Sequence, residues 1–230
     1  MCGTGERFKA AGYTEPKPWI DVKGRTMIDR VVENLKQIVA ADRMRFIFVT
    51  RDGLHGPLNL REDQYRVVKT DRPTRGAVDS LLAARTWITN EQPLVVANCD
   101  QIVNLEPHEW VIPIGKDASV LTFFAPDHST AWSYVETDEQ NNITRIAEKQ
   151  PISSDAVVGI YYFRQGWQFS SAVADVLDRR APSPNGEFYT SAVIQEMANG
   201  GYQIDACPVE RARVHMIGTP ELVKEYEQCL

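Results

Sequence analysis

The stretch Gly3-Thr4-Gly5-Glu6-Arg7-Phe8, followed closely by Pro16-Lys17-Pro18, is the most informative part of this 230-residue chain. Glycines let backbone amides approach a phosphate chain closely. Arg7 and Lys17 are cations able to neutralise the charge that builds up during phosphoryl or nucleotidyl transfer. A glycine pair with one arginine also occurs in ordinary turns, and the third glycine of the dinucleotide fingerprint is absent. The loop alone is therefore equally compatible with a structural turn.

The order of the motifs after the loop is more specific than the loop itself. Gly12-Tyr13 comes next, then the run from Pro16 to Val22, Gly24, and Met27-Ile28 at the start of an expected helix. This order resembles the N-terminal signature of the sugar-nucleotide pyrophosphorylases. These nucleotidyltransferases join a nucleoside triphosphate to a sugar 1-phosphate or a similar phosphorylated compound. Further motifs follow in the family's order as far as the terminal helix.

The resemblance assigns roles to the loop residues. It implies that Arg7 holds the triphosphate and that Lys17 meets the α-phosphate as charge develops there. It also implies a nucleotide-binding role for three residues of the loop, which are Gly3, Thr4 and Gly5.

Apolar periodicity along the chain alternates between helix and strand. A helix is expected at 26–40, with Thr26 as its N-cap, and another from Thr219 onward. Strands are expected at 45–50, 64–70, 94–97, 118–124, 132–137, 143–148, 157–163, 202–209 and 212–215. This alternation predicts one α/β domain over residues 1–230, with a Rossmann-like, mostly parallel mixed sheet flanked by helices. The resemblance implies the nucleotide-diphospho-sugar transferase type of this fold.

The beginning of the chain departs from that fold. In doubly wound folds the phosphate loop follows a buried parallel strand, and here no apolar run precedes Gly3. The first strand is thus expected to be missing. Either the true start lies upstream, where about five to eight apolar residues should be encoded, or the fold closes without that strand.

Composition restricts the classes of function. The net charge of -6 argues against a nucleic-acid-binding surface. No apolar run has the length of a membrane span and no signal peptide is recognisable, so the expected location is cytoplasmic. The four cysteines are far apart and lack the spacing of a zinc site, which favours reduced thiols. The oligomeric state is left open.

Two segments after strands carry candidate ligand-binding residues. Thr74, Gly76 and Ala77 precede an expected helix; Gly76 is compatible with a plain turn, whereas the resemblance places all three beside the nucleotide base. Asp100 follows the buried run 94–97, where open α/β sheets bind ligands. A single aspartate after a strand is usually a turn residue, but the family has a metal ligand here. Asp100 is therefore predicted to bind Mg²⁺ or Mn²⁺.

The acceptor side is predicted from three later motifs. Glu148 and Lys149 end an expected hairpin and resemble the Glu-Lys pair that contacts the sugar and its phosphate, although such neighbours are often solvated. Gly159 lies in a strand and marks either close approach of a ligand or a bulge. Glu187 either binds an acceptor hydroxyl or amine or caps the following helix.

The predicted activity is transfer of a nucleoside monophosphate from a nucleoside triphosphate to a phosphorylated acceptor, with release of pyrophosphate. The acceptor is a sugar 1-phosphate or a small phosphorylated alcohol or amine, in the setting of bacterial capsule or lipopolysaccharide pathways. No protein nucleophile is required, because the acceptor is already an anion. Neither the base nor the acceptor can be identified from the sequence.

Two alternatives remain. A glycosyltransferase that uses a nucleotide sugar commonly carries an Asp-x-Asp motif, whereas this chain has Asp100-Gln101-Ile102. A non-catalytic nucleotide-binding regulatory protein is the other. Many relatives have a second metal-binding aspartate where this chain has Met216, and a thioether is a poor ligand for Mg²⁺. His215 or Asp205 could replace that ligand, or water and phosphates could complete the metal shell.

Overall fold

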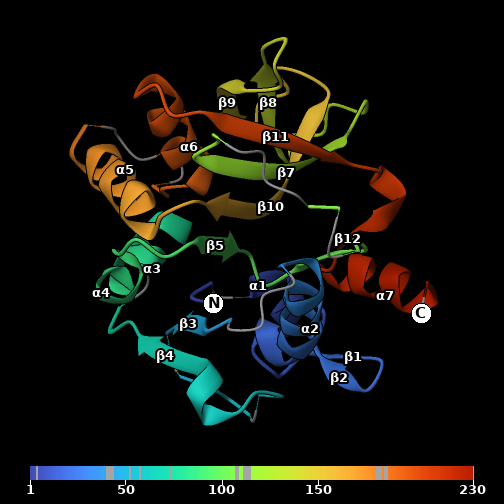
Figure 1. Cartoon of the computed structure of the whole chain (residues 1–230). Helices are drawn as coiled ribbons and strands as arrows, with labels where there is room; N and C mark the ends of the chain where they lie inside the picture. The colour runs from blue at the N-terminus through green and yellow to red at the C-terminus, as the bar shows by residue number, and fades with distance from the viewer. Residues whose placement is uncertain are drawn as a thin grey trace. The chain divides into compact units, whose positions relative to one another are not determined.

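A computed structural model of the chain describes all residues except 4, 40–43, 52, 57, 73, 107–108, 111–114, 180–182, 184–185 and 230. It contains two compact units, each assembled from separate stretches of sequence. Unit 1 comprises residues 1–73, 98–111 and 212–230, and unit 2 comprises residues 74–97 and 112–211. Figure 1 shows the helices and strands of both units. The predicted α/β class with a mixed sheet is confirmed.

Unit 1 combines short strands with two longer helices. Strands β3 and β4 pair in parallel, whereas β1 with β2 and β6 with β12 pair antiparallel. The elements are α1 (Glu6–Ala10), η1 (Lys17–Trp19), β1 (Asp21–Val22), β2 (Arg25–Thr26), α2 (Met27–Val39), β3 (Phe46–Thr50), η2 (Glu62–Gln64), β4 (Tyr65–Lys69), β6 (Gln101–Val103), β12 (Val214–Met216) and α7 (Pro220–Gln228). The turn η3 (Arg211–Arg213) leads into β12.

Helix α2 begins as the sequence predicts and fixes the position of β6. The backbone amide of Asp29 donates to Thr26 Oγ1 at 3.2 Å, so Thr26 is the N-cap. The buried Asn34 side chain donates to the carbonyl of Val103 at 2.8 Å and accepts from its amide at 2.9 Å. This double contact satisfies a buried amide group and ties β6 to the helix. Asp100 directly precedes that strand.

The terminal helix α7 also starts at the predicted cap. Thr219 Oγ1 accepts a hydrogen bond from the amide of Leu222 at 3.4 Å, and Pro220 occupies the first turn, where its missing amide hydrogen is not needed. The amide of Ile217 donates to the carbonyl of Asp100 at 2.9 Å. The connection from β12 to α7 therefore runs directly beside Asp100.

Unit 2 is built on a six-stranded sheet with the order β11-β7-β10-β8-β9, in which β5 also pairs with β10. Its elements are α3 (Gly76–Ala83), α4 (Arg85–Ile88), β5 (Leu94–Ala97), β7 (Ala118–Phe124), β8 (Ser133–Thr137), β9 (Ile143–Glu148), β10 (Asp155–Phe163), α5 (Gly166–Arg179), α6 (Thr190–Asn199) and β11 (Ile204–Val209). The predicted β8–β9 hairpin is confirmed, and Asn141 in its connection has a left-handed backbone.

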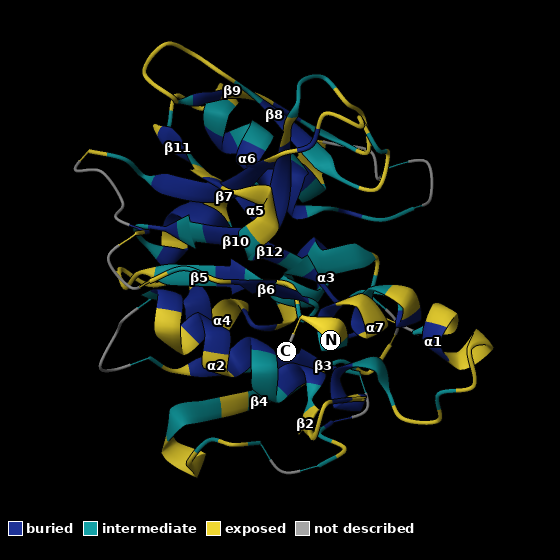
Figure 2. Cartoon of the chain, turned by 90° about the vertical axis from the view of Figure 1, so that its right-hand side faces the viewer, coloured by how far each residue is buried: buried dark blue, intermediate teal, exposed yellow. Residues whose placement is uncertain are grey.

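This sheet is mixed because one of its pairs is parallel and the others are antiparallel, with β10 at its middle. Strand β10 runs antiparallel to β5, β7 and β8, while β11 pairs with β7 in parallel. Strands β7 and β10 are drawn almost wholly in the colour of buried residues in Figure 2, in agreement with the exposure of their side chains. In the part of the chain that the structure describes, no helix has both the length and the apolar character needed to cross a bilayer.

Candidate active site

Lys17 and Asp100 form the central contact of the candidate site in unit 1. The ammonium of Lys17 donates a hydrogen bond to Asp100 Oδ2. The two side chains keep 22% and 20% of their exposure, so the pair is open to a ligand. Lys17 lies in η1 behind the glycine loop, and Asp100 lies just before β6. The structure thus joins two residues that the sequence predicted separately for catalysis and for metal binding.

The surroundings of Lys17 keep it charged. Burial by itself lowers the pKa of Lys17, but the charges of Asp100 and Cys99 and the hydrogen bond to Asp100 outweigh burial. The net effect raises the pKa of Lys17 above its ordinary value, with Arg7 acting weakly in the opposite direction. The ammonium also lies 5.9 Å from the centroid of the Phe8 ring, a favourable cation–π position. Lys17 is accordingly a cation at neutral pH.

The predicted phosphate loop packs against Lys17. Gly5 has a left-handed backbone (φ 66°, ψ 28°) at the N-cap of α1, and a Cβ there would lie 3.6 Å from the Lys17 Cβ. Gly3 is exposed and has open space around its Cα, and Arg7 is exposed on α1. Thr4 lies outside the described residues. The exposed Arg7 and Gly3 are free to meet an anionic ligand.

Gly218 is a residue of this site that the motif order did not single out. A Cβ on Gly218 would lie 3.0 Å from Asp100 Oδ2 and 3.7 Å from Lys17 Nζ. Any side chain here would therefore crowd the ion pair. A glycine before a helix cap was visible in the sequence, but only the fold shows what it faces.

The oxygen donors around Asp100 suit a hard cation. Asp100 supplies a carboxylate, and the neighbouring Gln101 has a buried Oε1 that finds no hydrogen-bond partner among the described residues. Met216 is buried in β12 opposite Gln101 and offers only a soft thioether. Among the described residues no group of three or more His, Cys, Asp or Glu could hold a metal. One carboxylate completed by water and phosphates is a known arrangement for Mg²⁺, so Asp100 fits that role.

The two proposed substitutes for the second metal ligand have other contacts. His215 Nε2 lies 3.0 Å from Asn104 Nδ2, and its ring lies 5.2 Å from the ring of Tyr226. Asp205 belongs to β11 in unit 2 and accepts a hydrogen bond from Ser119 Oγ at 3.3 Å. In these positions both side chains serve local structure.

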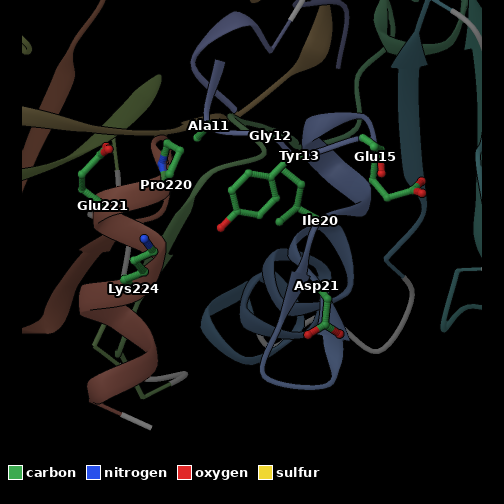
Figure 3. Close-up of a pocket in the computed structure, with 10 residues that line it drawn as sticks. Ala11, Gly12, Tyr13, Glu15, Ile20, Asp21, Pro220, Glu221 and Lys224 are labelled. Atoms are coloured by element: carbon green, nitrogen blue, oxygen red, sulfur yellow. The ribbon is translucent and has the colours of Figure 1, made fainter. Parts of the chain in front are cut away.

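A shallow pocket of about 580 Å³ lies elsewhere in unit 1, between the loop 11–15 and the first turns of α7. Figure 3 shows its lining, with the ring of Tyr13 facing Pro220 and Lys224. The lining of the pocket contains three carboxylates, those of Glu15, Asp21 and Glu221, and a single ammonium, that of Lys224. Such an excess of negative charge disfavours a triphosphate, and none of the predicted nucleotide-binding residues lines the pocket.

In unit 2 the predicted base-binding segment is packed against the segment that carries Glu187. Gly76 has φ 89°, and a Cβ there would lie 2.6 Å from the carbonyl oxygen of Phe188. The amide of Phe188 donates to the carbonyl of Arg75 at 2.8 Å, and the Arg75 guanidinium lies 5.1 Å from the Phe188 ring centroid. Thr74 Oγ1 lies 2.7 Å from Ser80 Oγ, and Ala77 is half-buried in the first turn of α3. Only glycine fits at position 76.

Three of the four predicted acceptor residues lie near one another in sequence elements that follow or precede α6 and β9: Glu148 ends β9, Lys149 follows it, and Glu187 comes shortly before α6. Glu148 Oε2 accepts hydrogen bonds from Ser133 Oγ and from Ser191 Oγ, the latter at 2.9 Å. Burial, and to a lesser degree the Glu148 carboxylate, raises the pKa of Tyr161 on β10. Glu148 and Glu187 line one pocket of about 210 Å³, together with Ile146, Val176, Ser183, Phe188, Tyr189, Ser191 and Ala192. The motifs did not identify Ser133 and Ser191, which contact Glu148, or Tyr189, which lines the pocket.

Lys149 is connected to the residues of this pocket by hydrogen bonds, whereas Gly159 has a role in the backbone of β10. Lys149 Nζ donates to Tyr189 Oη at 3.0 Å, and Tyr189 Oη donates to Glu187 Oε2. The hydrogen bond to Tyr189 raises the pKa of Lys149, against a smaller opposing effect of burial. Gly159 has φ 99° where the register of β10 against β7 shifts, so its local role is a β-bulge.

Comparison with known proteins places this arrangement in a family. Residues 2–109, which contain the glycine loop, Lys17 and Asp100, match the family described as MobA-like NTP transferase domain. This match, over a little less than half of the chain, makes residues 2–109 similar to a family of nucleotidyltransferases. The family assignment predicted from the motif order is thereby confirmed.

Two curated proteins and one solved structure illustrate what the whole chain is similar to. The chain is 23% identical to the bifunctional protein GlmU of Thermodesulfovibrio yellowstonii over 90% of its length, and it spans 45% of that protein. It is 24% identical to the UTP--glucose-1-phosphate uridylyltransferase AglF of Haloferax volcanii, covering 99% of this chain and 93% of AglF. A nucleoside-diphosphate-sugar pyrophosphorylase from Vibrio cholerae has the same fold, with a TM-score of 0.81, 21% identity, and coverage of 99% and 97%.

Proposed function

We propose that this chain transfers a nucleoside monophosphate from a nucleoside triphosphate to a phosphorylated acceptor and releases pyrophosphate. The observation that carries the proposal is the partly exposed Lys17–Asp100 pair behind the glycine loop. It combines a fixed cation for phosphate oxygens with a carboxylate for a divalent metal ion. The similarity to AglF, a UTP--glucose-1-phosphate uridylyltransferase, and the family matched by residues 2–109 support the same chemistry.

In the proposed reaction an oxygen of the acceptor phosphate forms a bond to the α-phosphorus. The bond between the α-phosphorus and the oxygen leading to the β-phosphate breaks, and pyrophosphate leaves. Lys17 neutralises the α-phosphate as charge develops, and the exposed Arg7 guanidinium holds the triphosphate. The enzyme's task is to position two polyanions and offset their repulsion.

A divalent cation, Mg²⁺ or Mn²⁺, is part of the proposal. Asp100 would hold it, with water and phosphate oxygens as the other ligands. When bound, such an ion withdraws charge from phosphate oxygens and aligns them. Because Lys17 engages the same carboxylate, its ammonium would compete with the metal ion for Asp100 and would be available to the nucleotide phosphates.

Other predicted residues keep proposed roles within their own units. Gly3, Thr4 and Gly5 are proposed to meet the phosphates through backbone amides. In unit 2 we assign three residues to the base, Thr74, Gly76 and Ala77, and four to the acceptor, Glu148, Lys149, Gly159 and Glu187. The two carboxylates and the hydroxyls in the pocket of about 210 Å³ suit an acceptor with hydroxyl or amine groups.

The proposed setting is cytoplasmic, since a nucleoside triphosphate is the donor, and in bacterial capsule or lipopolysaccharide synthesis. The chain is proposed to act as one nucleotidyltransferase domain on small molecules, with no nucleic-acid or membrane partner. The chain is also similar to the low-salt glycan biosynthesis nucleotidyltransferase Agl11 of Haloferax volcanii, which supports a role in glycan synthesis.

The test is a screen of nucleoside triphosphates against phosphorylated acceptors, with pyrophosphate as the readout. We expect one pair to give release that requires Mg²⁺ or Mn²⁺ and stops in excess chelator. Asp100→Asn should abolish this release. If wild type binds nucleotide without releasing pyrophosphate, while Met216→Asp does release it, the chain is a binding protein and the enzymatic proposal is wrong.

A further inference from the structure

Tyr189 lies between two residues of opposite charge in unit 2. Its hydroxyl accepts a hydrogen bond from Lys149 Nζ at 3.0 Å and donates one to Glu187 Oε2. The Lys149 ammonium is also 4.9 Å from the centroid of the Tyr189 ring. A phenol hydroxyl is both donor and acceptor, and here each function meets a charged group.

We propose that Tyr189 is a positioning residue that keeps Lys149 and Glu187 apart and oriented for a phosphorylated acceptor. This inference rests on the proposed function, because it assigns one part of the acceptor to Lys149 and another part to Glu187. The Lys149 ammonium meets the acceptor phosphate, and the Glu187 carboxylate meets the hydroxyl or amine groups of the remainder.

The opposite charges of Lys149 and Glu187 explain why a residue between them is needed. Lys149 is exposed on a left-handed residue (φ 54°) at the end of β9, and Glu187 lines the neighbouring pocket. A flexible lysine that paired directly with Glu187 would cancel both charges and leave neither for a ligand. The hydroxyl of Tyr189 lets each group satisfy one hydrogen bond and keep its charge. Chains of hydrogen bonds with one direction also strengthen each other.

The backbone at Tyr189 and Glu187 is held by hydrogen bonds, which fixes the point from which the Tyr189 side chain extends. Tyr189 is the N-cap of α6, with an extended backbone (φ -99°, ψ 154°), and its carbonyl accepts from the amide of Ala192 at 3.1 Å. Ser183 holds the carbonyl of Glu187 through its amide at 3.0 Å and its Oγ at 2.8 Å. A ring side chain has only two rotatable bonds, so little freedom is lost on ligand binding.

The first experiment needs no substrate. The side-chain ammonium of Lys149 is followed by NMR in protein that carries isotope-labelled lysine, with Lys149→Arg as the assignment control. Tyr189→Phe removes only the hydroxyl and should displace this signal. Tyr202→Phe, a half-buried tyrosine of unit 2 outside the pocket lining, should leave it in place. A Lys149 signal that stays unchanged in Tyr189→Phe overturns the proposal.

The second experiment titrates inorganic phosphate into the ligand-free proteins and follows the same signal. Wild type and Tyr202→Phe should respond with one affinity, and Tyr189→Phe should bind roughly tenfold more weakly, as expected for loss of a charge-assisted hydrogen bond. A wild-type signal that ignores phosphate, or equal affinity in Tyr189→Phe, overturns the assignment.

Kinetics then separate positioning from general stability. With an active substrate pair, Tyr189→Phe should raise the KM for the acceptor about tenfold and leave the KM for the nucleotide unchanged. The loss in the double variant Tyr189→Phe, Lys149→Met should be smaller than the sum of the two single losses, because only the effect through Glu187 remains once Lys149 is absent. Additive losses overturn the proposal. Absence of turnover in wild type with every pair contradicts the proposed function instead, and the phosphate titration still decides the role of Tyr189.

Discussion

Lys17 and Asp100, 83 positions apart in the sequence, are joined by a direct ion pair in unit 1. The pair is partly exposed, so it does not form to stabilise a dry core. It holds the ammonium of Lys17 against the carboxylate that we propose as the metal ligand. A bound nucleotide and metal ion would give each group a new partner of opposite charge, which makes the pair a resting arrangement of the site.

Replacing Lys17 with methionine should lower turnover at least ~100-fold, because one preorganised cation at the reacting phosphate is removed. Methionine keeps the apolar part of the side chain as far as Cε and lacks only the ammonium, so packing beside Phe8 changes little. The matched control is Lys9→Met, since Lys9 is an exposed lysine of the same loop region that contacts Glu6 at 3.7 Å. Steady-state pyrophosphate release measures both. If Lys17→Met turned over at the wild-type rate, Lys17 would have no role in the reaction.

The same variant should bind metal more tightly in the absence of nucleotide. In wild type the Lys17 ammonium competes for Asp100 Oδ2 and repels a divalent ion. Removing that charge should increase Mn²⁺ affinity roughly tenfold, the usual scale of one charge-assisted hydrogen bond. Electron paramagnetic resonance of free Mn²⁺ gives this affinity without turnover, and Asp100→Asn should show no such site. Equal Mn²⁺ binding in wild type and Lys17→Met would contradict the competition.

Local signals explain which parts of the fold were predictable. Helix α2 and the cap of α7 were predicted because Thr26 and Thr219 act on amides three residues away. The hairpin β8–β9 was predicted because alternation and a short polar turn lie in one stretch. Pairing between strands that are distant in sequence gives no local sequence signal. The antiparallel pairing of β10 with β5 and β7 could therefore be recognised only from the structure.

The candidate site divides in the same way. Residue type and motif order pointed to Lys17 and Asp100 individually, while their contact depends on how η1 and β6 pack. Gly218 and Tyr189 carry no motif of their own. Their relevance comes from an atom they approach, Asp100 Oδ2 in one case and Lys149 Nζ in the other. The remaining assigned roles of Glu148, Gly159 and the base-binding segment stay predictions.

Cys207 should make stability depend on alkaline pH. Burial, with a smaller effect of Asp205, raises the pKa of Cys207 from 9.0 to about 11. The folded state therefore holds this proton more tightly than the unfolded chain does. Stability from this group is complete below the unfolded value of 9.0 and is lost as pH rises towards about 11, because the unfolded chain ionises first.

The measurement is the thermal midpoint of wild type and Cys207→Ala across that range. Both proteins lose stability at high pH through other groups, so the decisive quantity is the difference between them. The advantage of wild type over the variant should shrink between pH 9 and pH 11. A difference that stays constant would show that the thiol is not protected by burial.

Gly76 should tolerate substitution less well than Gly201, another glycine of unit 2 that has a left-handed backbone. Two separate costs act at position 76: a left-handed backbone with φ 89°, and a Cβ that would lie 2.6 Å from the carbonyl oxygen of Phe188 and 3.0 Å from its amide nitrogen. The first costs about 1–2 kcal/mol for a residue with a side chain. The second forces the 187–188 backbone to move, since no flexible side chain can yield.

Gly201→Ala supplies the matched control for this substitution. Gly201 has φ 82°, and a Cβ there would meet nothing within 4 Å, so it suffers only the backbone cost. Gly76→Ala should therefore lower the free energy of unfolding by more than Gly201→Ala, by an additional amount on the order of 1–3 kcal/mol typical of overpacking. Denaturant unfolding of the two variants measures this difference. Because the 187–188 segment carries Glu187, Gly76→Ala should also raise the acceptor KM, whereas Gly201→Ala should not. Equal stability of the two variants would mean that position 76 is not in contact with Phe188 in the folded protein.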